Sequence, residues 1–167
     1  MSLKKVAVMS PGDMGEGIAA SIKGQGIEVI TCLAGRSDET RMRAERSGLQ
    51  EVAGLDALVN EADLVISILP PEQAEEFATT VAAAMIRSRK NPPFADMNAI
   101  APTTAKRISA IIEGAGSIYI DGGIIGLPPF KGVDDTKLYV SGPGAKIMAE
   151  LNGNGTVSYT HLRAHET

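Results

Sequence analysis

Two glycines near the N-terminus have the type and spacing that suit phosphate binding. The apolar run Val6-Ala7-Val8-Met9 passes directly into Ser10-Pro11-Gly12-Asp13-Met14-Gly15, and a helical pattern follows at once. In this order Gly12 lets the backbone approach a pyrophosphate, and Gly15 lets the helix pack closely on the strand. The start of the helix then presents N–H groups to the anion. The segment predicts a dinucleotide site, although Ser10 stands where the G-x-G-x-x-G fingerprint has its first glycine.

A second polar segment, Ala34-Gly35-Arg36-Ser37, follows the next apolar run. NAD-selective sites place Asp or Glu near this position for the ribose 2′-hydroxyl, whereas NADP sites place an arginine nearby for the 2′-phosphate. There is no acid at the end of this run, and Arg36 offers a planar cation beside the Ser37 hydroxyl. The sequence therefore favours NADP as the cofactor, with NAD possible. The alternative for Arg36 is a solvated arginine on a charged loop.

Strand and helix patterns alternate along the chain. Apolar runs predict strands over 4–9, 27–33, 63–69, 94–97, 117–121 and 136–141. Helical spacing and capping signals predict helices over 13–25, 38–46, 55–61 and 102–112, with another from residue 71. This alternation predicts an α/β fold: a Rossmann-like, doubly wound, mostly parallel sheet with helices on both faces. Ligands bind such sheets beyond the carboxyl ends of the strands.

Three further polar residues stand at predicted strand ends. The amide of Asn98 suits a substrate or a nicotinamide amide, and it equally suits the cap of the helix that begins near Pro102. Asp121 is either a catalytic carboxylate or an acid that organises its loop through backbone N–H groups, and Asp96 has the same two interpretations.

The composition indicates a single globular domain. A length of 167 residues suits one buried core, and 44% hydrophobic with 22% charged residues is ordinary for a soluble protein. A net charge of -4 argues against nucleic acid as a partner. No apolar run suits a bilayer span or a signal peptide, so no membrane partner and a cytoplasmic location are expected. The one cysteine, Cys32, reads as a buried structural thiol.

Four segments occur in the order and at the spacing of one family's motifs. Ser10 to Gly15 looks like G-L-G-x-M-G, and Ala62-Asp63 through Leu69-Pro70 looks like A-D-x-V-I-x-x-L-P. Asp96 to Pro102 looks like D-x-S-T-I-x-P, and Asp121 to Gly142 looks like D-A-P-V-S-G-G with the following strand. Over about residues 4–150 the chain thus resembles the β-hydroxyacid dehydrogenases, which include 6-phosphogluconate and 3-hydroxyisobutyrate dehydrogenases.

The resemblance implies an NAD(P)-binding domain over residues 1–150, from an oxidoreductase that passes hydride to or from a small hydroxy acid or carbonyl substrate. Its cofactor residues are carried over to Ser10, Pro11, Gly12, Asp13, Met14, Gly15, Leu69, Pro70, Asn98 and Ala99, joined by Arg36 and Ser37, whose turn is similar to the N-R-T turn of NADP-using members. Its substrate residues correspond to Asn98, Gly122, Gly123 and Ile125.

Three departures from the family bear on the substrate. Ser10 replaces a glycine, Asn98-Ala99 replaces Ser-Thr, and Ile125-Gly126-Leu127 stands where Ser-Gly-Gly helps to hold substrate. The missing serine argues against 6-phosphogluconate and 3-hydroxyisobutyrate as substrates. Two alternatives share this cofactor domain: a non-catalytic dinucleotide-sensing module and an imine reductase.

The family's catalytic lysine lies on a long helix that opens an all-helical second domain, which also builds a homodimer. This sequence stops before that helix, and neither Lys131 nor Lys137 has the helical context. We therefore expect no catalytic residue in this chain, and dinucleotide binding with little or no turnover.

The final segment, 151–167, is expected to be a non-native or disordered tail. Asn152-Gly153-Asn154-Gly155 has the composition of a flexible link, and 157–167 resembles translated sequencing-adapter read-through. His161 and His165 lie in this tail at i, i+4 spacing without a third ligand or a general base, so no metal site is predicted.

Overall fold

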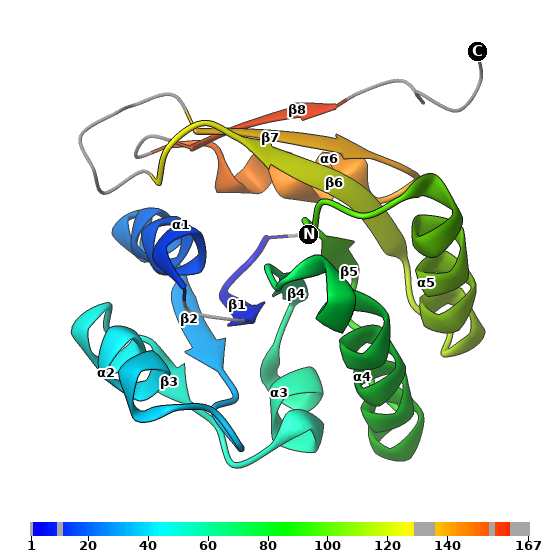
Figure 1. Ribbon diagram of the computed structural model, residues 1–167, viewed down its shortest axis with the longest axis horizontal. Coiled ribbons are helices and arrows are strands. Elements are labelled where there is room, and N and C mark those ends of the chain that lie inside the picture. The colour runs from blue at the N-terminus through cyan, green and yellow to red at the C-terminus, as the bar shows by residue number, and fades with distance from the viewer. Residues whose placement is uncertain (1, 10–11, 129–135, 154–155, 161–167) are drawn as a thin grey trace.

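The computed structural model describes residues 2–9, 12–128, 136–153 and 156–160, and in these ranges eight strands form one sheet (Figure 1). The strands are β1 (Lys5–Met9), β2 (Glu28–Thr31), β3 (Gln50–Glu51), β4 (Leu64–Ser67), β5 (Phe94–Asp96), β6 (Tyr119–Ile125), β7 (Thr136–Ser141) and β8 (Thr156–Thr160). Their order is β3-β2-β1-β4-β5-β6-β7-β8. β1 to β6 run parallel, β7 is antiparallel to β6, and β8 is parallel to β7.

Helices connect the strands and cover both faces of the sheet. The α-helices are α1 (Asp13–Gly24), α2 (Asp38–Arg46), α3 (Leu55–Glu61), α4 (Ala74–Ser88), α5 (Pro102–Gly114) and α6 (Ala145–Met148), with short 3-10 turns at Pro71–Gln73 and Ala149–Leu151. Apolar residues of α1, α2 and α6 pack on one face, and those of α3, α4 and α5 pack on the other. Figure 1 shows α3, α4 and α5 grouped apart from α1 and α2. The predicted doubly wound α/β fold is confirmed.

Local sequence explains the helices nearest the first strand. In α1, Ile18, Ala19 and Ile22 recur at helical spacing and are buried. Their partners Val6 and Val8 alternate with Ala7 along β1, and all three are fully buried because both faces of the strand are covered. This packing fixes where the chain leaves β1 and enters α1.

The course of the chain creates a divide between β1 and β4. From β1 it winds outward through β2 to β3, then returns to β4 on the other side of β1 and winds toward β6. The Ile68 N–H, just past β4, donates to the Met9 carbonyl at the end of β1. Ligand crevices of doubly wound sheets lie at this reversal, outside the carboxyl ends of the two central strands.

Three strands differ from the sequence-based expectation, and the short helix α6 was not predicted. β3 was not predicted, because two exposed residues carry no apolar pattern. β6 continues to Ile125 instead of ending at Asp121, because β7 pairs with it antiparallel as far as Ile125. Thr156–Thr160 forms β8 where no regular element was expected; the free edge of β7 offers backbone groups to any extended neighbour. Ser10, Pro11, Lys131, His161 and His165 lie outside the described residues.

None of the helices in the described ranges is long and apolar enough to cross a membrane. Cys32 is buried, as expected for a structural thiol, and its backbone N–H lies 3.4 Å from Met9 Sδ.

Candidate cofactor cleft

A cleft of about 440 Å³ opens at the carboxyl ends of β1 and β4. It is lined by Gly12, Asp13, Met14, Gly15, Arg36, Glu39, Thr40, Arg43, Ile68, Leu69 and Pro70. Its volume falls within the range of roughly 300–1,000 Å³ that small-molecule sites occupy. Seven of the residues predicted to contact the cofactor thus line this one cleft, at the point where the strand order reverses.

The first turn of α1 forms one side of the cleft. Gly12 is the N-cap residue of α1, in an extended conformation with φ -84°, and Gly15 is buried behind it. Having no side chain, Gly12 cannot cap the helix as a serine would, and the residues from Gly12 to Gly15 all line the cleft. A Cβ atom placed on Gly12 would meet nothing within 4 Å. The space beside Gly12 therefore suits a group that approaches the backbone closely, as a pyrophosphate does.

The β4 side of the cleft is held by Asn98. Its Oδ1 accepts from the Leu69 N–H at 2.6 Å, and its Nδ2 donates to Ser67 Oγ at 3.0 Å. The side chain is buried, and α5 begins after Ala101 without a side-chain cap. Of the two interpretations of Asn98, the helix cap is wrong, because both ends of its amide cross-link the end of β4 to the end of β5. Asn98 borders the cleft only through Leu69, and the exposed Ala99 beside it does not line the cleft.

We expect Asn98→Ala to lower the free energy of unfolding by about 1–3 kcal/mol, since a buried donor and acceptor lose their partner. Leu69 would also lose the bond that fixes its backbone at the cleft. Chemical denaturation measures the loss. Thr103→Ala, at an exposed position of α5, is a control for truncation of a polar side chain away from this network. Equal unfolding midpoints for Asn98→Ala and the parent would contradict the cross-linking role.

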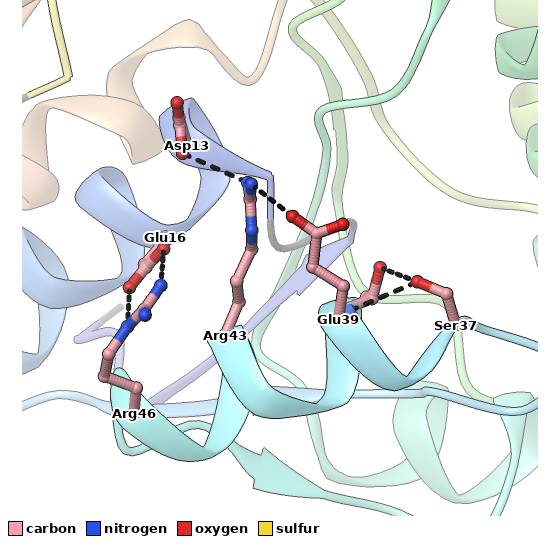
Figure 2. Close-up of polar contacts among 7 residues, drawn as sticks. Asp13, Glu16, Ser37, Glu39, Arg43 and Arg46 are labelled. Carbon is pink, nitrogen blue, oxygen red and sulfur yellow. Dashed lines mark hydrogen bonds and ion pairs between the residues drawn. The ribbon is translucent and has the colours of Figure 1, made fainter.

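The start of α2 forms another wall of the cleft. Ser37 caps α2, because its Oγ accepts from the Thr40 N–H at 3.2 Å (Figure 2). Ser37 was predicted to contact the cofactor, but it is not among the residues that line the cleft, whereas its neighbour Arg36 is. The cap sets the direction of α2 and so places Arg36, Thr40 and Arg43 along this wall.

Two arginines of α2 bind two acids in the first turn of α1. Arg43 Nη1 lies 3.0 Å from Asp13 Oδ1, and its Nη2 lies 2.9 Å from Glu39 Oε1. One turn further on, Arg46 Nε lies 3.2 Å from Glu16 Oε1 (Figure 2). Sequence reasoning missed Glu39, Thr40 and Arg43 at the cleft. The i, i+4 spacing of Glu39 and Arg43 was a visible signal for one pair, but nothing local connects Arg43 to Asp13.

Asp96 organises the turn after β5, as one of its two interpretations predicts. Its Oδ1 accepts from the Asn98 N–H at 3.0 Å, and its Oδ2 lies 3.4 Å from the Tyr119 hydroxyl, which donates to it. Burial raises the pKa of the Asp96 carboxyl to about 6, with a further rise from the charge of Asp121. Burial also raises the pKa of Tyr119, with the nearby carboxylates adding to the effect.

A raised pKa in the folded state makes stability fall as pH rises. Between the ordinary value of 3.8 and about 6, the folded chain holds a proton on Asp96 that the unfolded chain has lost. The stability that protonated Asp96 contributes is therefore fully present below pH 4 and is lost above about pH 6. We expect Asp96→Asn, which keeps the acceptor for Asn98, to remove this dependence and to gain stability over the parent by about 1–3 kcal/mol at pH 7. Thermal melts from pH 4 to 7 test this. Midpoints that change with pH in the same way in Asp96→Asn and in the parent would contradict it.

Three of the four residues predicted to hold substrate lie on β6, outside the cleft. Gly122, Gly123 and Ile125 are in the strand instead of the predicted loop, and Ile125 is 60% exposed. A Cβ on Gly122 would come within 2.9 Å of Met97 Cε and 3.1 Å of the Tyr139 carbonyl, so packing explains this glycine. Asp121 and Tyr119 both line a separate pocket beside α5.

Comparisons with known proteins identify the family of this chain. Residues 5–141 match the NAD binding domain of 6-phosphogluconate dehydrogenase, and the chain belongs to that family. A solved structure of a conserved protein of unknown function, described as similar to 3-hydroxyacid dehydrogenases, is 28% identical with a TM-score of 0.82 over 95% of this chain. The chain is thus an NAD-binding domain of the hydroxyacid dehydrogenase-like oxidoreductase family.

Two further structures share the fold at lower identity. The 3-hydroxyisobutyrate dehydrogenase of Mycobacterium tuberculosis, solved with L-serine, is 23% identical with a TM-score of 0.76 over 96% of this chain. A variant of the imine reductase from Myxococcus stipitatus, solved with NAD+, is 16% identical with a TM-score of 0.72 over 96%. The chain spans 55 to 58% of the length of these three structures.

Proposed function

We propose that this chain is the NADP-binding domain of an oxidoreductase that passes hydride to or from a small hydroxy acid or carbonyl substrate. The observation that carries the proposal is the cleft itself, in which the first turn of α1, without a side-chain cap, and Arg36 line one space. The first suits a pyrophosphate and the second suits a 2′-phosphate.

Different residues of the cleft would bind different parts of the cofactor. The first-turn backbone from Gly12 to Gly15 would hold the pyrophosphate, and Arg36 would hold the phosphate on the adenosine ribose. Leu69 and Pro70, fixed through Asn98, would bound the cofactor on the β4 side. When bound, the dinucleotide supplies or accepts the hydride at its nicotinamide.

The acid and base for such a reaction would come from outside this cleft. None of the described residues that line it is a lysine or a histidine, and Lys137 lies on β7 opposite Ile125. We therefore propose binding with little or no turnover by the chain as given. For the longer protein we propose a small-molecule substrate, no nucleic-acid or membrane partner, a cytoplasmic location and a homodimer formed through a helical domain.

An imine reductase is the second candidate, favoured by the shared fold of the imine reductases from Myxococcus stipitatus and Pseudomonas sp.. It uses the same cleft, so the cofactor proposal is common to both. Two assays on a longer homologue separate the candidates: reduction of cyclic imines with NADPH, and oxidation of small hydroxy acids with NADP+. A homologue that binds NADPH and turns over neither class favours a dinucleotide-sensing module.

Calorimetric titration of the full chain with NADPH and NADH tests the proposal. We expect both to bind at one site, with NADPH the tighter ligand. Absence of binding by either dinucleotide would overturn the proposed function, and tighter binding of NADH would overturn the cofactor preference alone.

A further inference from the structure

An acidic residue stands where the cofactor phosphates are expected. Asp13 is the first residue of α1 and lines the cleft beside Gly12. A carboxylate at a helix N-terminus is favourable while the site is empty, because it faces the positive end of the helix. A pyrophosphate at the same helix end would meet that carboxylate at close range, and like charges repel strongly where the protein wall displaces water.

Arg43 supplies the opposite charge at this point. Its guanidinium lies between Asp13 and Glu39, 3.0 and 2.9 Å from their carboxylate oxygens, and it also lines the cleft (Figure 2). The side chain of Arg43 is 27% exposed, against 58% for Asp13 and 76% for Glu39, so the arginine is the most enclosed member of the three. Of the described cleft residues, two acids and two arginines carry formal charge, and loss of Arg43 would leave the cleft negative.

We propose that Arg43 is a positioning residue that neutralises and turns aside the Asp13 carboxylate, so that a dinucleotide pyrophosphate can bind at the start of α1. The inference rests on the proposed function and deepens it. Arg43 then acts on every dinucleotide through Asp13, whereas Arg36 acts only on the cofactor that carries a 2′-phosphate. Arg43 therefore sets the affinity for both dinucleotides, and Arg36 sets the preference for NADP over NAD.

The chain contains a matched control for a merely structural role. Arg46 joins the same two helices through Glu16, at 3.2 Å, but neither residue lines the cleft. Arg46→Ala therefore removes an equivalent bridge between α1 and α2 without changing the charge at the phosphate position. A bridge that matters only for stability would give similar binding in Arg43→Ala and Arg46→Ala.

The experiment is titration of NADPH and NADH into the parent, Arg43→Ala, Asp13→Asn, the Asp13→Asn/Arg43→Ala double variant and Arg46→Ala. We expect Arg43→Ala to weaken both cofactors by the same factor, about five- to tenfold for the loss of one close charge pair. Asp13→Asn should restore binding in the double variant to within about twofold of Asp13→Asn alone, and Arg46→Ala should shift either affinity by less than about twofold.

The outcomes separate the inference from the proposed function. A parent that binds neither cofactor refutes the proposed function and the inference with it. A parent that binds, together with an Arg43→Ala variant of unchanged affinity or a double variant that recovers nothing, overturns the role of Arg43 alone. An effect of Arg43→Ala confined to NADPH would show a direct contact with the 2′-phosphate instead, and would also overturn it.

Discussion

Gly12→Ala is expected to abolish most dinucleotide binding while leaving the fold intact. Gly12 has an ordinary φ of -84°, and its Cβ would meet no atom within 4 Å, so alanine fits the backbone without strain. The added methyl would occupy the space in which a phosphate must approach the first-turn amides of α1. Charge-assisted hydrogen bonds of this kind contribute about 1.5–3 kcal/mol, so NADPH and NADH should both weaken by up to about a hundredfold.

A matched glycine gives the control for this substitution. Gly54 is the N-cap residue of α3, has an extended backbone, and also has open space at its Cβ position, but it does not line the cleft. Gly54→Ala should leave both affinities unchanged. Unaltered binding in Gly12→Ala, measured by calorimetry alongside equal thermal midpoints, would show that no phosphate rests against this turn.

Arg36→Ala is expected to separate the two cofactors. Loss of a bidentate arginine–phosphate contact should weaken NADPH by about ten- to hundredfold, whereas NADH, which lacks the 2′-phosphate, should change by less than about threefold. Arg36→Lys keeps the charge but loses the planar fork, so its NADPH affinity should fall between those of the parent and Arg36→Ala. The ratio of the two dissociation constants is the quantity to measure. A ratio that is the same in all three proteins would remove Arg36 from cofactor selection.

The central sheet and its flanking helices were predictable because their signals are local. The apolar runs at β1 and β4 have both faces covered, and the stripe of Ile18, Ala19 and Ile22 has the spacing of a helix face. The end of β6 was not predictable in this way. Its last residues are extended only because β7, some eleven residues further along the chain, pairs with them, and pairing between strands leaves no mark in either strand alone.

The residues of the site also differ in whether local sequence could predict them. The segment from Gly12 to Gly15, Arg36 and the Leu69-Pro70 turn were predicted from their places after predicted strands, and all of them line the cleft. The cross-link made by Asn98 was not predictable, because its partners, Leu69 and Ser67, lie about thirty residues away at the end of β4. The pairing of Arg43 with Asp13 joins residues thirty positions apart, and only the folded chain brings them together.

The position of the cofactor phosphates is the claim on which the cofactor preference and both arginine roles depend. A crystal structure of the full chain grown with NADPH measures it directly. We predict the diphosphate within hydrogen-bonding distance of the backbone N–H groups in the first turn of α1, with the 2′-phosphate at Arg36. An ordered dinucleotide bound at any other face, or a diphosphate kept away from Gly12 in that cleft, would contradict it.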